Sequence, residues 1–125
     1  MENKIAIVLH AGTESHEGLA RALHSLLYAK ELSEQGIGVR LIFDGAGTEW
    51  VARFGQPDTP QAKSLAGIFG TLKERGIAYE VCDFCSGAFG VKEELRSRGE
   101  RLVAQYMDHP SIASLVAAGY QVWIL

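Results

Sequence analysis

The chain has 125 residues, a length that fits one domain with a buried core, so we expect a single domain over residues 1–125. Hydrophobic residues make up 47% of the chain and charged residues 22%, which excludes a disordered or fibrous protein. The formal net charge is −3, and the Lys and Arg residues are scattered, which argues against a nucleic-acid-binding surface.

The N-terminal segment Met1–Lys4 leads directly into an apolar run, without the basic region and cleavage site of a signal peptide. No apolar run reaches the length of a membrane span. We therefore expect a cytoplasmic protein. Cys82 and Cys85 are the only cysteines, and in a reducing compartment such a pair is more often reactive or metal-binding than structural.

The first half of the chain predicts two strands and three helical segments. A nearly continuous apolar run rich in β-branched residues predicts a buried strand over residues 4–10. Leucines at helical spacing then predict a helix over residues 15–35, followed by a strand over 39–44. A short helical piece is expected over 48–54 and a full helix over 61–75, with a glycine just after its end.

The second half predicts three more strands, separated by helices. We expect strands over residues 77–82, 101–106 and 120–125. Helices are expected over 86–98 and from 109 to 118, where Pro110 suits a first helical turn. The alternation of strands and helices predicts an α/β fold with a mainly parallel five-stranded sheet and helices on both faces.

In an open parallel sheet, ligands bind beyond the carboxyl ends of the strands, where the strand order reverses. With the order 2-1-3-4-5, the loop over residues 10–15 would face the loop over residues 82–87 across that crevice. His10 ends the first strand, so we expect its side chain to lie near the thiols and to stabilise a thiolate.

Cys82 stands where a strand ends and a helix is about to begin. The unpaired N–H groups and the positive end of the helix dipole there favour the thiolate over the thiol, which predicts an exposed nucleophile. Cys85 follows near the first turn of that helix. The alternative is that both cysteines are inert and packed as small hydrophobic side chains.

The segment Cys82–Val91, with the sequence CDFCSGAFGV, resembles a stretch found in small single-domain members of the DsrE/DsrF-like sulfur-relay family. Further segments are similar to the same subgroup: Leu9–Thr13, Arg21–His24, Phe43–Gly47, His109–Ile112 and Gly119–Val122. The resemblance implies a three-layer flavodoxin-like fold, assembly into trimers or hexamers, and a persulfide-carrying cysteine at the position of Cys82. Cys85 departs from the family pattern, which generally has one essential cysteine here.

Our leading hypothesis is that Cys82 carries sulfur as a persulfide between donor and acceptor proteins, a role that needs no cofactor. A second hypothesis is dithiol–disulfide redox chemistry, in which Cys82 attacks and Cys85 resolves. A third is zinc binding by the two cysteines with one or two of His10, His16 and His109, although the second close-spaced ligand pair of a zinc signature is missing.

The remaining hypothesis is a ligand-binding or assembly module without catalysis. The segment Asp44–Gly47 lacks the third glycine of a dinucleotide-binding loop, and we interpret it as a turn. We also expect a closed homo-oligomer, because a small chain with many apolar residues often covers surface with a copy of itself.

Overall fold

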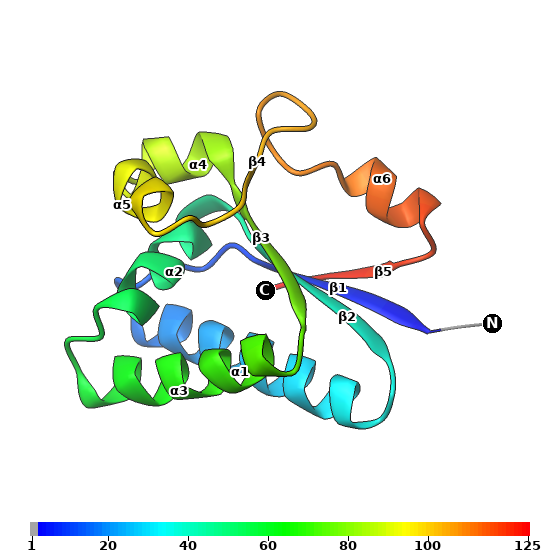
Figure 1. Cartoon of the computed structure of the whole chain (residues 1–125), viewed down its shortest axis with the longest axis horizontal. Helices are drawn as coiled ribbons and strands as arrows, with labels where there is room; N and C mark the ends of the chain where they lie inside the picture. The colour runs from blue at the N-terminus through cyan, green and yellow to red at the C-terminus, as the bar shows by residue number, and fades with distance from the viewer. Residues whose placement is uncertain (1–2) are drawn as a thin grey trace.

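The computed structural model describes residues 3–125, and Met1 and Glu2 of the N-terminal segment lie outside the described residues. No helix within residues 3–125 is long and apolar enough to cross a membrane. The elements in chain order, shown in Figure 1, are β1 (Lys4–Leu9), α1 (His16–Glu34), β2 (Gly38–Phe43), the 3-10 turn η1 (Gly45–Gly47), α2 (Thr48–Gly55), α3 (Pro60–Glu74), β3 (Ala78–Cys82), α4 (Asp83–Ala88), α5 (Lys92–Ser97), β4 (Leu102–Val103), α6 (Ile112–Ala117) and β5 (Gln121–Ile124).

The five strands form one sheet in the order β4-β3-β2-β1-β5, and every neighbouring pair is parallel. This confirms the predicted α/β class and the mainly parallel five-stranded sheet. The predicted order 2-1-3-4-5 is wrong, because β2 lies between β1 and β3. Successive crossovers step in one direction from β1 to β4, and the last connection returns to the other side of β1.

Alternate residues of the strands supply two separate cores. Ile5, Ile7 and Leu9 of β1 belong to the larger core, to which α1, α2 and α3 contribute. Their neighbours Ala6 and Val8 point to the opposite face, where they pack with Ile42 of β2 and Leu115 of α6. Figure 1 shows α1 and α3 on one side of the sheet and α6 on the other, so the predicted cover of both faces is confirmed.

Two predicted segments after β3 are divided or shortened. The helix expected over residues 86–98 is interrupted by Gly90, whose φ of +74° ends the helical path and separates α4 from α5. The strand expected over residues 101–106 is limited to Leu102–Val103. The helix expected from His109 begins later, because Ser111 caps it by accepting a hydrogen bond from the Ser114 N–H.

The connection between β4 and α6 must cross back over the ends of β3 and β2 to reach the far side of β1. Within it, residues 106–109 form a tight turn in which the Tyr106 and His109 backbones exchange two hydrogen bonds of 2.8 Å. The two central residues, Met107 and Asp108, have φ values of +49° and +65°. This turn, residues 106–109, is called the covering turn below.

Candidate functional site

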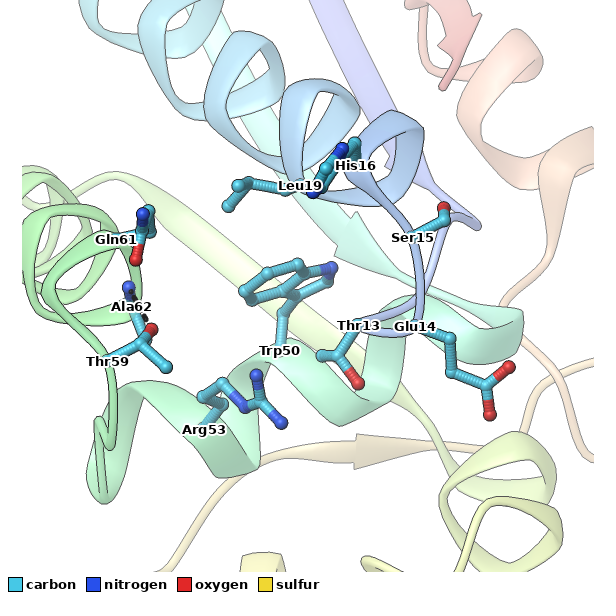
Figure 2. A pocket seen from close by; sticks show the side chains of 10 residues that line it. All are labelled: Thr13, Glu14, Ser15, His16, Leu19, Trp50, Arg53, Thr59, Gln61 and Ala62. Atoms are coloured by element: carbon cyan, nitrogen blue, oxygen red, sulfur yellow. Dashed lines mark hydrogen bonds between the residues drawn. The ribbon is translucent and has the colours of Figure 1, made fainter.

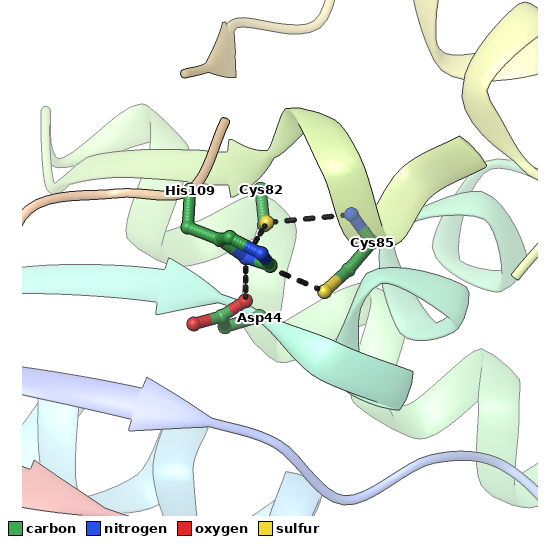
Figure 3. A group of neighbouring side chains, drawn as sticks. All are labelled: Asp44, Cys82, Cys85 and His109. Atoms are coloured by element: carbon green, nitrogen blue, oxygen red, sulfur yellow. Dashed lines mark hydrogen bonds and ion pairs between the residues drawn. The ribbon is translucent and has the colours of Figure 1, made fainter. Parts of the chain in front are cut away.

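Four side chains from separate elements meet at the carboxyl edge of the sheet (Figure 3). Asp44 follows β2, Cys82 ends β3, Cys85 lies in the first turn of α4, and His109 comes from the covering turn. One donor atom of each residue lies within 4.8 Å of the donor atoms of the other three. We call these four residues the cysteine cluster.

The strand register explains why Asp44 lies beside Cys82. Val8 pairs with Ile42, and Ile42 in turn pairs with Glu80. Because side chains alternate between the two faces of a sheet, the residues two positions further along each strand fall in one row on the same face. That row contains His10, Asp44 and Cys82.

The contacts of the cluster converge on one nitrogen of His109. The Nδ1 atom lies 3.0 Å from the Cys82 Sγ and 3.7 Å from the Cys85 Sγ. The same nitrogen is 3.7 Å from the Asp44 Oδ1. Both cysteines are free thiols, and the Cys85 backbone N–H donates a hydrogen bond of 3.4 Å to the Cys82 Sγ.

Burial controls the protonation of the two thiols. The Cys82 residue is 0% exposed and Cys85 is 9% exposed. Burial raises the pKa of Cys82, and the neighbouring Asp44 raises it further, although the Cys85 N–H acts in the opposite direction. The pKa of Cys85 is also raised, mainly by burial. Both thiols are therefore protonated near neutral pH.

The expectation of an exposed and easily ionised sulfur at position 82 is therefore wrong. The covering turn lies over this sulfur, since the Asp108 carbonyl oxygen is 3.9 Å from the Cys82 Sγ and also accepts a 3.0 Å hydrogen bond from the Phe84 N–H. Loss of solvation outweighs the favourable field at the N-terminus of α4, which is only six residues long.

Asp44 is held in place on both of its carboxylate oxygens. Its Oδ1 accepts a 2.8 Å hydrogen bond from the Gly45 N–H, and its Oδ2 lies 3.3 Å from the His10 Nε2. Burial on its own would raise the pKa of Asp44, but hydrogen bonds from Cys82 and Gly45 and the charge of His10 lower it overall. The cluster thus contains a carboxylate anion next to two thiols.

Of the three side chains predicted to take part in catalysis, Cys82, Cys85 and His10, the two cysteines belong to the cluster. The His10 Nε2 contacts the Asp44 Oδ2, and β2 lies between β1, which precedes His10, and β3, which ends with Cys82. Asp44 was interpreted as part of a turn, and His109 was named only as one of three possible zinc ligands, without a predicted position. Side chains alternate between the two faces of β2, and this alternation is the signal in the sequence that could have placed Asp44 on the same face as Cys82.

A separate pocket of about 510 Å³ lies among the first turn of α1, the helix α2 and the start of α3 (Figure 2). His16, Trp50 and Arg53 are among the residues that line it, and no member of the cysteine cluster does. The structure therefore does not place His16 where it could bind zinc together with the two cysteines.

The fold and the site together define an α/β protein with a paired-cysteine centre at the carboxyl edge of a parallel sheet. The model of the DsrE/DsrF-like family matches residues 3–123, so the chain belongs to this family, which is associated in general with sulfur relay. The expected family membership is thereby confirmed.

Two similar proteins have no characterised activity. An uncharacterised protein of Methanocaldococcus jannaschii is 29% identical over 100 residues, which cover 80% of this chain and 76% of that protein. A conserved protein of unknown function from Bacteroides thetaiotaomicron has a similar solved structure, with a TM-score of 0.64 and 21% identity. That match covers 98% of this chain and 95% of the other, and it shows the shared fold.

Proposed function

We propose that this chain is a sulfur-relay protein that holds a sulfur atom on Cys82 as a persulfide and passes it to an acceptor thiol. The observation that carries the proposal is the 3.0 Å distance between the Cys82 Sγ and the His109 Nδ1. A buried thiol with a raised pKa needs a nearby proton acceptor before it can act as a nucleophile, and His109 is positioned for that task.

The transfer proceeds in two thiol-exchange steps. The Cys82 thiol gives its proton to the His109 Nδ1, and the thiolate attacks the outer sulfur of a donor persulfide, R–S–SH. The donor S–S bond breaks, a new S–S bond forms on Cys82, and the leaving thiolate R–S⁻ takes the proton from His109. An acceptor thiolate then attacks the outer sulfur and releases the Cys82 thiolate.

The other members of the site support this chemistry from fixed positions. Asp44 faces the His109 Nδ1 at 3.7 Å and stabilises the imidazolium that forms when the nitrogen takes the proton. His10 acts through Asp44 as a positioning residue, because its contact is with the Asp44 Oδ2. A donor reaches Cys82 when the covering turn moves aside. The reducing conditions of the cytoplasm would keep both thiols free.

Mass spectrometry of the full-length chain tests the proposal. The reduced, metal-free protein is incubated with a small persulfide donor, and the modified thiols are mapped. We expect one added sulfur on Cys82 in the natural chain and in the Cys85→Ser variant, and no added sulfur on the Cys82→Ser variant. No added sulfur on any of these chains would overturn sulfur carriage.

Dithiol–disulfide redox chemistry is the second candidate, and the proximity of the two sulfurs favours it. The Cys82 and Cys85 sulfurs belong to a cluster whose donor atoms lie within 4.8 Å of one another, so a modest movement would join them. A small disulfide oxidant added to the reduced chain should then give an intramolecular disulfide and two reduced oxidant thiols. If it does, and the Cys85→Ser variant, which has no resolving thiol, gains no sulfur from the persulfide donor, the redox function replaces the relay function.

We also propose that the chain works as a homo-oligomer, a trimer or a hexamer. Within residues 3–125, β5 pairs only with β1 and forms an edge of the sheet, where Trp123 and Ile124 are 37% and 59% exposed. Tyr28 of α1 meets the Trp123 ring edge-on at 6.4 Å. Light scattering at micromolar concentration should give an oligomer for the natural chain and a monomer for Ile124→Glu. A monomeric natural chain would refute this assembly.

A further inference from the structure

We propose that the cysteine cluster is also a four-ligand binding site for a zinc-class divalent cation. This inference goes beyond sulfur relay and does not depend on it. The evidence is the placement of a carboxylate, two thiols and an imidazole around one point, with all four donor atoms within 4.8 Å of one another.

The use of a single His109 nitrogen favours a metal site over a catalytic triad. In a triad, the acid and the nucleophile contact opposite nitrogens of the imidazole, so that one orients the ring while the other loses its proton. Here Asp44, Cys82 and Cys85 all face the Nδ1 atom, at 3.7, 3.0 and 3.7 Å. Figure 3 shows the four side chains pointing toward one another. Donors that converge in this way share a centre that one cation can occupy.

Three of the six donor–donor distances lie close to those around a tetrahedral ion, and the other pairs, which are no more than 4.8 Å apart, would have to close to the same range on binding. Metal–ligand bonds of about 2.0–2.3 Å place the ligand atoms about 3.3–3.8 Å apart at the corners of a tetrahedron around zinc. Both 3.7 Å distances already lie in this range. The 3.0 Å distance between the Cys82 Sγ and the His109 Nδ1 must lengthen by about half an ångström to accommodate the ion.

The types of donor select the class of metal. Two sulfur ligands disfavour Mg²⁺ and Ca²⁺, which take oxygen ligands, and favour Zn²⁺ or a similarly soft ion. Four protein donors would fill the tetrahedral coordination shell of zinc.

The surroundings of the ligands resemble the outer shell of a metal site. The Asp44 Oδ2 contacts His10, and its Oδ1 is held by the Gly45 N–H, so the carboxylate is already oriented. His109 is fixed by the backbone hydrogen bonds of the covering turn and by ring contact with Phe84 at 5.0 Å. A preorganised ligand set loses little conformational freedom when the ion binds.

Metal binding would compete with sulfur carriage, because both use the same sulfurs. A bound ion occupies the Cys82 and Cys85 sulfurs and protects them from a persulfide donor or an alkylating reagent. The metal-loaded chain would therefore hold both sulfurs in an unreactive form, and removal of the ion would free them for reaction.

Titration of the full-length, reduced, metal-free chain with Zn²⁺ and with Co²⁺ tests the site. We expect one ion per chain, and for Co²⁺ the intense near-ultraviolet absorption of cobalt–thiolate bonds together with the visible bands of a tetrahedral ion. Asp44→Asn and His109→Gln should each weaken the affinity at least tenfold, and His10→Gln, in the outer shell, by roughly tenfold. His16→Gln is the matched control and should leave the affinity unchanged.

Two results would overturn the inference: less than about a tenth of an ion per chain without cobalt–thiolate absorption, or equal affinity in the natural chain, Asp44→Asn and His109→Gln. The second result would mean that the thiols alone capture the ion. Circular dichroism confirms that each variant is folded. Sulfur loading is measured on the metal-free chain, so either proposal can fail while the other stands.

Discussion

The two thiols of the cysteine cluster differ in exposure, and this difference predicts the order in which they react. Cys85 is 9% exposed and Cys82 is 0% exposed, and both have raised pKa values. Iodoacetamide should therefore modify Cys85 before Cys82, slowly at neutral pH and faster as the pH rises above the usual thiol range. Peptide mapping at timed intervals measures both rates. In guanidinium chloride, which unfolds the chain, the two rates should be equal. Equal rates in the folded chain would contradict the difference in burial between the two thiols.

A second prediction at the residue scale concerns Tyr79, whose hydroxyl donates a 2.6 Å hydrogen bond to the Glu100 carboxylate. Burial, followed by the hydrogen bond and charge of Glu100, raises the pKa of Tyr79 above its ordinary value of 10.0. The stabilisation is complete below pH 10 and declines as the pH rises toward the folded-state pKa, because the unfolded chain ionises first.

Tyr79→Phe should lower the free energy of unfolding at neutral pH by about 1 kcal/mol. It should also make the decline in stability above pH 10 shallower than in the natural chain. Urea unfolding at several pH values measures both effects. Tyr106→Phe is the control, since that residue is 68% exposed and should change neither quantity. An unchanged alkaline slope in Tyr79→Phe would contradict this account.

At the scale of elements, the covering turn contains a strained position. Met107 has a φ of +49° and is 75% exposed, so its side chain gains little packing in return for the unfavourable backbone. Met107→Gly should raise the free energy of unfolding by up to about 1 kcal/mol, whereas Met107→Ala retains a Cβ and should give no such gain. Thermal unfolding compares them, and equal midpoints would show that the turn is not strained there.

The helix α6 depends on one buried side chain to cover its face of the sheet. Leu115 is 4% exposed and packs with Ala6, Val8 and Ile42. Leu115→Ala should lower the free energy of unfolding by about 2–4 kcal/mol, because it leaves a cavity in a small core. Val116→Ala, on the exposed side of α6, should change stability by less than about 0.5 kcal/mol. Similar losses in both variants would refute this role of Leu115.

At the scale of the whole molecule, the sequence predicted the layers of the fold better than the order of its strands. Hydrophobic periodicity identifies buried strands such as 4–10 and amphipathic helices such as 15–35, because each local pattern reflects which face is buried. It does not record which strands are neighbours. The order β4-β3-β2-β1-β5 results from the direction of successive crossovers, and the error in order placed His10 rather than Asp44 beside the thiols.

The members of the candidate site were also predictable only in part. Cys82 and Cys85 could be chosen from their chemistry and their position at a strand end. His109 could be named only as one of three possible zinc ligands, because its contact with Cys82 spans 27 residues and depends on the return connection from β4 to α6. Only the folded chain shows that this connection passes over the ends of β2 and β3.

We propose that these four side chains act as one unit that loads and returns sulfur at Cys82. The most direct measurement follows, by intact-protein mass spectrometry, the gain of one sulfur atom from a persulfide donor and its loss to an acceptor thiol. We predict that the natural chain completes this cycle with the sulfur on Cys82, and that His109→Gln does so at least tenfold more slowly. A natural chain that never gains the sulfur, or a His109→Gln variant that cycles equally fast, would contradict the account.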